Sequence, residues 1–488
     1  MQALPCAIGS DGMNSVADPF LSEARTLLGE RGFTTDPDLI EPWLTDWRGR
    51  YTGAARGMAQ PANAEELAEL VRLCARHGVP IVPQGGNSGM SGGATPDDSG
   101  RAVLVSLRRM NAIRALDAQA MTVQCEAGVI LQSLHDATEA KGLRFPLTLG
   151  GKGSATIGGL ISTNAGGTQV LRHGSMRAQV LGLEAVLADG TIYSALTPLK
   201  KDNRGFDLKQ LFIGSEGTLG IITAATLRLV PAVAERTVAW IGLSSVQHAR
   251  ALLLHCQEQA GDALEGFEVL PQSCLDAVVA YLPDARAPLA QPHAWHALIE
   301  LVGTGSREIA EVSLAAALKR DLIEDAVIAA SEAQAEDFWK LRESISPAER
   351  AKGPAMQHDI AVPVERMADF LENAVPLMEA RWPGTRAFGF GHLGDGNVHF
   401  HVQAPTGVDR CTWEQSDGKA ISQAVDDLVT AWNGTISAEH GIGQLKVDEL
   451  ERLADPAALA LLHKVKAALD PQGLFNPGKL LAPRPATA

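Results

Sequence analysis

The spacing of apolar residues predicts an amphipathic helix over residues 63–77, in which Leu67 and Leu70 share one face. An apolar run at 79–82 follows directly and predicts a short buried strand. That strand leads into a loop at 83–93 that is unusually rich in glycine.

Similar patterns predict the rest of an N-terminal part that ends at Pro231. Between 180 and 194, two apolar runs flank Asp189-Gly190, a dipeptide typical of a tight hairpin, so two antiparallel strands are expected. The other elements predicted here are helices over 22–32 and 129–142, and strands over 101–107, 121–126 and 221–229.

Beyond Pro231 the glycine loops disappear and strands alternate with helices. This alternation predicts a second α+β domain with helices on one face of an antiparallel sheet. No internal repeat is visible, and we expect the first 20 residues and the tail from 483 to be unstructured. The predicted strands are 237–243, 298–302 and 398–402, and the predicted helices are 246–260, 306–317, 338–349 and 456–469.

Glycine gathers in three loops beside strand-like sequence, at 83–93, 148–167 and 212–220. Seven of the twenty residues in the second loop are glycine, interleaved with serine, threonine and asparagine. Because glycine loses the most backbone entropy on folding, such density is tolerated where the backbone must approach a ligand closely. Bare N–H groups and small hydroxyls then form a cradle for phosphate. Three such loops predict one large phosphate-containing cofactor.

Charge and cysteine usage narrow the possible partners and compartment. The net charge of −15 argues against nucleic acid or an anionic membrane surface, since both attract lysine and arginine. No apolar run approaches the roughly 20 residues of a spanning helix, and the N-terminus does not resemble a secretory signal. The six cysteines are scattered, which disfavours a disulfide framework or a structural metal site. We expect a cytoplasmic protein of two domains.

Four motifs in order along the chain resemble one flavoprotein superfamily. They are PQGGNSGMSGG (83–93), PLTLGGKGSATIGGLISTNAGG (146–167), GSEGTLGI (214–221) and FNPGK (475–479). The superfamily is that of vanillyl-alcohol oxidase and p-cresol methylhydroxylase. Within it, residues 40–482 look most like the D-2-hydroxyglutarate and D-lactate dehydrogenases.

The resemblance implies an α+β fold, with a two-part FAD-binding domain of the p-cresol methylhydroxylase type and a C-terminal α+β substrate or cap domain built on a ferredoxin-like sheet. The expected division is an N-terminal extension (1–40), the FAD-binding domain (41–232) and the C-terminal domain (233–484), whose last segment returns to the flavin. The first glycine loop holds no histidine, so non-covalent FAD is expected. The residues expected to bind FAD are Pro83, Gly85, Gly86, Asn87, Ser88, Gly89, Leu149, Gly150, Gly153, Ser154, Gly158, Ser162, Thr163, Asn164, Gly166, Glu216, Gly217, Gly220, Ile221 and Asn476.

A second set of residues carries the candidate chemistry: His392, His399, His401, Glu439 and His440. His399 and His401 alternate on a predicted strand and share one face, so spacing by itself makes them candidate joint ligands. Imidazoles with one carboxylate suit zinc or another borderline divalent ion. The resemblance instead implies that His392, His399 and Glu439 hold the metal. It also implies that His401, where the family usually has asparagine, faces the substrate.

Oxidation of an alcohol by hydride loss needs a base for the hydroxyl proton, and histidine suits that task near neutrality. The resemblance assigns the role to His440. It also implies that Arg342 binds the substrate carboxylate and that Ser346, one helical turn later, stands in for a family threonine. Gln357 replaces a family lysine. The loss of that charge weakens the hold on a second carboxylate and leaves room for a monocarboxylate such as lactate.

Two other motif matches are rejected. The GxGxxG match at 389–394 precedes a predicted strand where a helix is required, and the near-Walker match at 473–479 continues into Leu480, where serine or threonine is needed.

The leading hypothesis is an FAD-dependent dehydrogenase that oxidises a D-2-hydroxy acid to the 2-oxo acid. An electron-transfer flavoprotein or a quinone is the expected acceptor, and a homodimer is one expected assembly. The alternatives are an oxygen-using flavin oxidase, a zinc-dependent hydrolase in which His440 activates water, and a non-catalytic flavin subunit.

Overall fold

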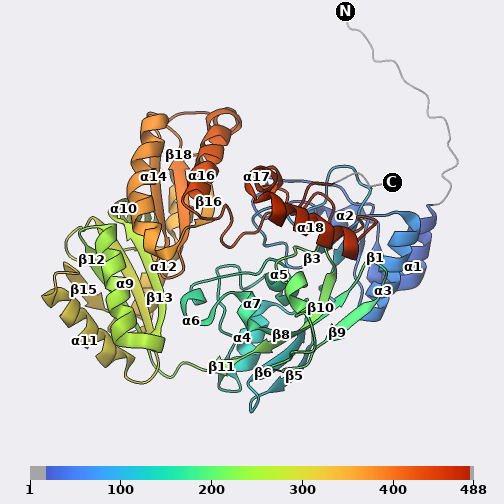
Figure 1. Ribbon diagram of the computed structural model, residues 1–488, viewed down its shortest axis with the longest axis horizontal. Helices are drawn as coiled ribbons and strands as arrows, with labels where there is room; N and C mark the ends of the chain where they lie inside the picture. The colour runs from blue at the N-terminus through green and yellow to red at the C-terminus, as the bar shows by residue number, and fades with distance from the viewer. Residues whose placement is uncertain (1–17, 200, 484–488) are drawn as a thin grey trace, which may run out of the picture.

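The computed structural model describes residues 18–199 and 201–483. The chain forms two parts, and its last segment, coloured red in Figure 1, returns to the N-terminal part. The predicted unstructured ends fall almost wholly outside the described residues. None of the described helices is long and apolar enough to cross a membrane.

The N-terminal part begins with a small sheet in the order β1-β2-β4-β3, packed against α1 (Pro19–Gly32) and α3 (Ala64–His77). Helix α3 confirms the predicted amphipathic segment. Asn63 starts it by accepting the N–H of Glu66 at 2.8 Å, and Gly78 ends it in the left-handed region at φ 62°. The strands are β1 (Phe33–Thr34), β2 (Gly57–Ala59), β3 (Ile81–Gln84) and β4 (Val103–Ser106), and α2 (Pro37–Ile40) lies between the first two.

A second, antiparallel sheet has the order β5-β6-β10-β8-β9. Strands β8 (Val180–Val186) and β9 (Ile192–Ala195) form the predicted hairpin, with Gly190 at φ 77° in its turn. Helices α5 and α7 pack against β10 and β8 of this sheet (Figure 1). The other elements are β5 (Ile113–Asp117), β6 (Thr122–Glu126), α4 (Leu131–Glu139), β7 (Leu143–Arg144), α5 (Ile157–Ser162), α6 (Val170–His173), α7 (Met176–Gln179), α8 (Lys209–Phe212), β10 (Ile221–Arg228) and β11 (Val230–Pro231).

The C-terminal part is built on one antiparallel sheet in the order β15-β12-β14-β13-β17-β18-β16. Its first four strands follow the βαββαβ pattern with helices α9 and α11, and α10 is inserted between the two middle strands; β16-α14-β17-β18-α16 repeats most of that pattern. The repeat was not visible in the sequence. The elements are β12 (Arg236–Leu243), α9 (Val246–Ala260), β13 (Leu264–Pro271), α10 (Gln272–Tyr281), β14 (Trp295–Val302), α11 (Ser306–Lys319), β15 (Asp325–Ile328), α12 (Glu332–Glu343), α13 (Ile345–Lys352), β16 (Ala355–Ala361), α14 (Met367–Arg381), β17 (Arg386–His392), β18 (Asn397–Gln403), α15 (Arg410–Trp413) and α16 (Lys419–Ala431).

Helices cover both faces of this sheet, so the prediction of helices on one face is wrong. Ala239 and Ile241 of β12 pack with α9, α11, α14 and α16, whereas Val238 and Trp240 pack with α10, α12 and α13. Because both faces are buried, the strands carry nearly continuous apolar runs that hide their alternation.

The helix predicted over 338–349 is two helices, α12 and α13, which meet at Ser344. Pro347 has no N–H to donate to the carbonyl of Glu343, so the first helix cannot continue. Ser346 therefore does not follow Arg342 on the face of one continuous helix.

After α16 the chain crosses back through α17 (Val447–Leu453) and α18 (Pro456–Leu469). Phe475 forms a parallel bridge with Ile81, and Asn476 donates its N–H to the Ile81 carbonyl at 2.8 Å. The C-terminal segment thus lies beside β3 and the first glycine loop.

Candidate active site

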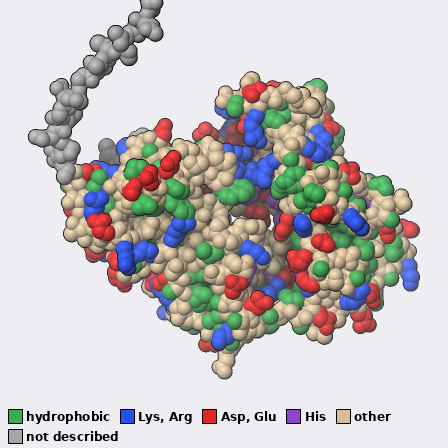
Figure 2. Space-filling view, turned by 180° about the vertical axis from the view of Figure 1, so that it is seen from behind, with side chains coloured by type: hydrophobic (Ala, Val, Ile, Leu, Met, Phe, Trp, Pro, Cys, Tyr) green, Lys and Arg blue, Asp and Glu red, His purple; other side chains and the backbone are tan. Residues whose placement is uncertain are grey.

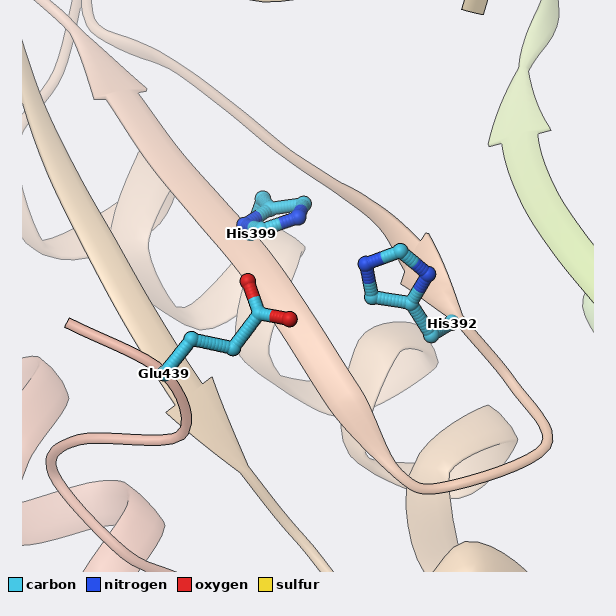
Figure 3. Close-up of side chains that lie close together, drawn as sticks. All are labelled: His392, His399 and Glu439. Carbon is cyan, nitrogen blue, oxygen red and sulfur yellow. The ribbon is translucent and has the colours of Figure 1, made fainter. Parts of the chain in front are cut away.

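Three side chains that could hold an ion meet beside strands β17 and β18 of the C-terminal sheet. His392 ends β17, His399 lies on the neighbouring strand β18, and Glu439 comes from the loop after α16. One ligand atom from each lies within 4.8 Å of the others, and Figure 3 shows the three pointing towards a common space. His401 is not in this group, because the next residue on the same face of a strand is about 7 Å away.

Glu268 of β13 is completely buried behind His392 and Arg342. Its carboxylate accepts from Arg342 Nε at 2.8 Å and bonds Nδ1 of His392. Burial opposes ionisation of Glu268, but Arg342 and His392 lower its pKa to about 2. A donor bond from Nδ1 to a carboxylate fixes the imidazole and leaves Nε2 as the ligand atom.

Asp359 of β16 organises the other side of the site, and sequence reasoning assigned it no role. Its buried carboxylate accepts the backbone N–H of Glu439 at 2.8 Å and of His440 at 2.9 Å. Nδ1 of His440 lies 3.6 Å away and Nδ1 of His399 lies 3.8 Å away. Burial would raise the pKa of Asp359, but these two histidines hold it below its ordinary value. The signal available in the sequence was the aspartate two residues after Gln357.

The two residues that Asp359 positions differ in their ionisation. Burial lowers the pKa of His440, although Asp359 partly opposes the shift, so the imidazole is neutral and can accept a proton. Burial raises the pKa of Glu439 to about 7. A bound cation would favour its ionised form.

A cavity of about 390 Å³ lies in the N-terminal part between the first two glycine loops. Gly86, Gly153 and Ser154 of the predicted FAD set line it. A Cβ on Gly86 would lie 1.8 Å from the carbonyl oxygen of Ser154, so the two loops touch backbone to backbone and only glycine fits. Its other lining residues lie outside the predicted FAD set; they are Arg108, Asn111, Ile113, Gly128, Val129, Ile130, Ser133 and Thr156.

Three predicted FAD residues hold the loops together through protein contacts. Asn164 Oδ1 accepts from Ser175 Oγ at 3.0 Å. The carboxylate of Glu216 accepts the N–H groups of Ile442 and Gly443, each at 2.7 Å. The side chain of Asn476 donates to the carbonyl oxygens of Gly93 and Glu216. Glu216 thereby joins the third glycine loop to the segment that follows His440, and Asn476 joins the last segment of the chain to the first and third loops.

The second glycine loop reaches Glu439, one of the three candidate ligands. A Cβ on Gly166 would lie 3.0 Å from a carboxylate oxygen of Glu439. Figure 2 shows the molecule hollowed between its two parts. A glycine-lined cavity between the first two loops fits a phosphate-bearing redox cofactor, and the imidazoles and carboxylates that meet at Glu439, beside Gly166, fit a divalent ion.

Comparison with known proteins agrees with this geometry. Residues 55–195 match the FAD binding domain, and residues 233–480 match the C-terminal domain of FAD linked oxidases. The chain is 36% identical over 466 residues to the mitochondrial D-2-hydroxyglutarate dehydrogenase of Arabidopsis thaliana, covering 94% of this chain and 81% of that protein. It is 34% identical over 473 residues to the D-2-hydroxyglutarate dehydrogenase of Stutzerimonas stutzeri (strain A1501), covering 96% and 100%.

The chain belongs to the D-2-hydroxyglutarate dehydrogenase family of FAD-linked oxidases. The predicted resemblance is confirmed. Among solved structures, p-cresol methylhydroxylase with substrate bound matches with a TM-score of 0.72 at 16% identity, over 95% of this chain and 96% of that one. An alkyldihydroxyacetonephosphate synthase matches with a TM-score of 0.73 at 17% identity, over 94% and 84%. These likenesses bear on the fold, and they confirm the predicted fold class.

Proposed function

We propose that this chain is an FAD-dependent dehydrogenase that oxidises a D-2-hydroxy acid to the corresponding 2-oxo acid. The observation that carries the proposal is the meeting of His392, His399, Glu439 and His440 beside Gly166 of the glycine stretch. Relatives that match this chain over 94–96% of its length and are named D-2-hydroxyglutarate dehydrogenases support it.

His392, His399 and Glu439 are the residues that would hold a divalent ion, zinc or another. Such an ion, when bound, polarises the substrate hydroxyl, and FAD, when bound, supplies the hydride acceptor. His440 is neutral and takes the hydroxyl proton on its imidazole, while Asp359 stabilises the charge that the ring gains.

Arg342 presents its guanidinium from between Glu268 and the ring of Phe390, whose centroid lies 4.9 Å from Cζ. Glu268 holds one edge of the guanidinium, so the side chain is fixed before substrate arrives. We propose that its remaining edge orients the carboxylate next to the reacting carbon, with Ser346 nearby on α13.

The reduced flavin would pass its electrons to an electron-transfer flavoprotein or a quinone, as the resemblance implies. Direct use of oxygen is the alternative. No specific observation favours the zinc-dependent hydrolase. Hydrolysis would also leave the three glycine loops without a function.

The test is an anaerobic absorbance titration of the purified protein with D-2-hydroxyglutarate, D-malate and D-lactate. We expect a flavin spectrum that is bleached by at least one of them. A flavin spectrum that no D-2-hydroxy acid bleaches would overturn the proposal, as would a protein that binds no FAD after reconstitution.

A further inference from the structure

Arg48 of the N-terminal part reaches across to the C-terminal sheet. Its Nη1 donates to Gln357 Oε1 of β16 at 2.6 Å, and its Nη2 lies 3.3 Å from the sulfur of Met90 in the first glycine loop. The loop that carries it is held by Asp46, whose carboxylate accepts the N–H groups of Arg48 and Tyr51 at 3.1 and 2.7 Å. The guanidinium is therefore placed in advance at the junction of the two parts.

Three polar atoms around this junction are buried and have no hydrogen-bond partner among the described residues. They are Nε of Arg48, Nε2 of Gln357 and Nδ1 of His401. Gln357 and His401 stand opposite each other in the β16–β18 ladder, and His401 is only 3% exposed. Buried polar atoms of folded proteins are almost always hydrogen-bonded, so three unpaired ones around one junction indicate a missing ligand.

These atoms are suited to an anion. Nε of Arg48 and Nε2 of Gln357 can only donate, and Nδ1 of His401 donates in one tautomer. Arg350 of α13 adds its charge to both Arg48 and His401. Within the described residues, no carboxylate forms an ion pair with Arg48, and the carboxylates of Asp46 and Asp359 are engaged by backbone N–H groups.

We propose that Arg48, Gln357 and His401 bind a second carboxylate of the substrate, remote from the carbon that is oxidised. The inference rests on the proposed function and adds to it a specificity-determining contact, Arg48, that the N-terminal part supplies beside Gln357. Arg48 thus restores the positive charge that the chain lacks at Gln357, and it does so from another domain. Gln357 by itself suggested a preference for a monocarboxylate, and the proposed contact predicts the opposite preference.

The spacing of residues along the sheet supports this assignment. His399, a candidate ligand beside the reacting hydroxyl, pairs with Asp359, and His401 pairs with Gln357 one step further along the same two strands. That step spans about 7 Å, because each residue advances a strand by about 3.3 Å. A carboxylate bonded directly to the reacting carbon cannot reach from one position to the other, whereas a carboxylate at the end of a short chain can.

The test compares flavin reduction by D-2-hydroxyglutarate and D-lactate in FAD-loaded R48L. Leucine keeps much of the bulk and removes the charge. Loss of charge-assisted hydrogen bonds predicts a fall of about 10- to 100-fold in kcat/KM for D-2-hydroxyglutarate. The expected change for D-lactate is less than about 3-fold. R101L removes an exposed arginine that bonds Ser99 and is the charge-matched control; it should leave both values unchanged.

Two further variants guard against an effect on folding. R48K keeps the charge without the planar fork and should give an intermediate loss for D-2-hydroxyglutarate. Q357K in the R48L background places a cation on the neighbouring side chain and should recover at least about 10-fold. Failure of this double variant to recover selectivity, in a protein that binds FAD normally, would overturn the assignment.

Binding of the reaction products tests the anion site independently of the proposed dehydrogenase activity. Thermal shifts with 2-oxoglutarate and pyruvate need no turnover, and R48L should lose the stabilisation by 2-oxoglutarate alone. Equal losses for the two substrates and the two products would mean that Arg48 binds the carboxylate next to the reacting carbon, which overturns the inference while the dehydrogenase stands. If no 2-hydroxy acid reduced the flavin of the wild-type protein, the proposed function would be wrong. The thermal shifts with the two products would still show whether the anion site exists.

Discussion

Asp359 is the side chain that positions the candidate base, His440, and the candidate metal ligand Glu439. One of its oxygens, Oδ2, accepts two backbone N–H groups, and the other, Oδ1, accepts the side-chain N–H of Asn397 at 2.9 Å. Three donors therefore surround an acceptor that is buried and ionised. No neutral side chain of the same shape can satisfy all three.

We predict that Asp359→Asn lowers the rate of flavin reduction by about 10- to 100-fold. In either orientation, the amide N–H of asparagine would face a donor that Asp359 now satisfies, so the loop that carries Glu439 shifts. Stopped-flow reduction of the holoenzyme measures the rate, and elemental analysis measures bound metal. A variant with full rate and full metal content would contradict this account of Asp359.

A second prediction at this scale concerns His440. His440→Asn removes the proton acceptor while leaving the backbone bond to Asp359 available, so kcat should fall by about 100- to 10,000-fold. The FAD spectrum and the metal content should stay near wild type. Full turnover in such a variant would assign the base elsewhere.

At the scale of elements, helix α16 buries an acidic side chain against the sheet that carries the site. Asp426 is only 6% exposed, and burial raises its pKa to about 7. A carboxyl whose pKa is higher in the folded chain binds a proton more readily there than in the unfolded chain. Stability is therefore lost between about pH 4 and pH 7, and the full penalty is present above pH 7.

We predict that Asp426→Asn stabilises the protein above pH 7, by on the order of 1–3 kcal/mol. The amide cannot ionise, so the difference from wild type should shrink to nearly zero below pH 4, where both chains are neutral at this position. Thermal denaturation across pH 4–8 measures the trend. The exposed neighbour Asp427 offers a matched control, since Asp427→Asn should give no comparable gain. A gain that is constant with pH would contradict the prediction.

At the scale of the whole molecule, the site exists because the C-terminal segment is tied to the glycine loops. Glu216, at φ 52° in the third glycine loop, accepts from Ile442 and Gly443 directly after His440. Ser91 of the first loop donates to the carbonyl of Gly441 at 3.0 Å. The two parts of the chain therefore meet next to the candidate catalytic base, His440.

We predict that Glu216→Gln lowers kcat by about 10-fold or more. Glutamine would present an amide N–H where the chain now needs two acceptors, leaving a buried donor unpaired. The change acts on the joint between the parts, so hydrogen exchange should rise at 439–445 while the strands of both sheets keep their protection. Unchanged exchange at 439–445 together with a lowered rate would place the effect in the flavin site instead.

The sequence by itself determined the features that depend on local order. Helices α3, α9 and α18 begin and end within a residue of their predicted bounds, because capping residues and apolar spacing are local signals. The Asp189-Gly190 hairpin followed from turn chemistry in the same way. The glycine motifs and the two short His/Glu segments indicated an FAD-linked enzyme, since each motif is a local stretch that can be compared with a family.

Only the tertiary structure decided which distant residues share the site. Glu268, Asp359 and Arg48 come from three separate regions of the chain, and sheet order and domain docking make them neighbours of His392, His440 and Gln357. No periodicity records such a neighbour, because the pairing of β13 with β17 and of β16 with β18 joins segments far apart in sequence. Charge is therefore readable from single positions, but the charge of a binding site is a property of the folded chain.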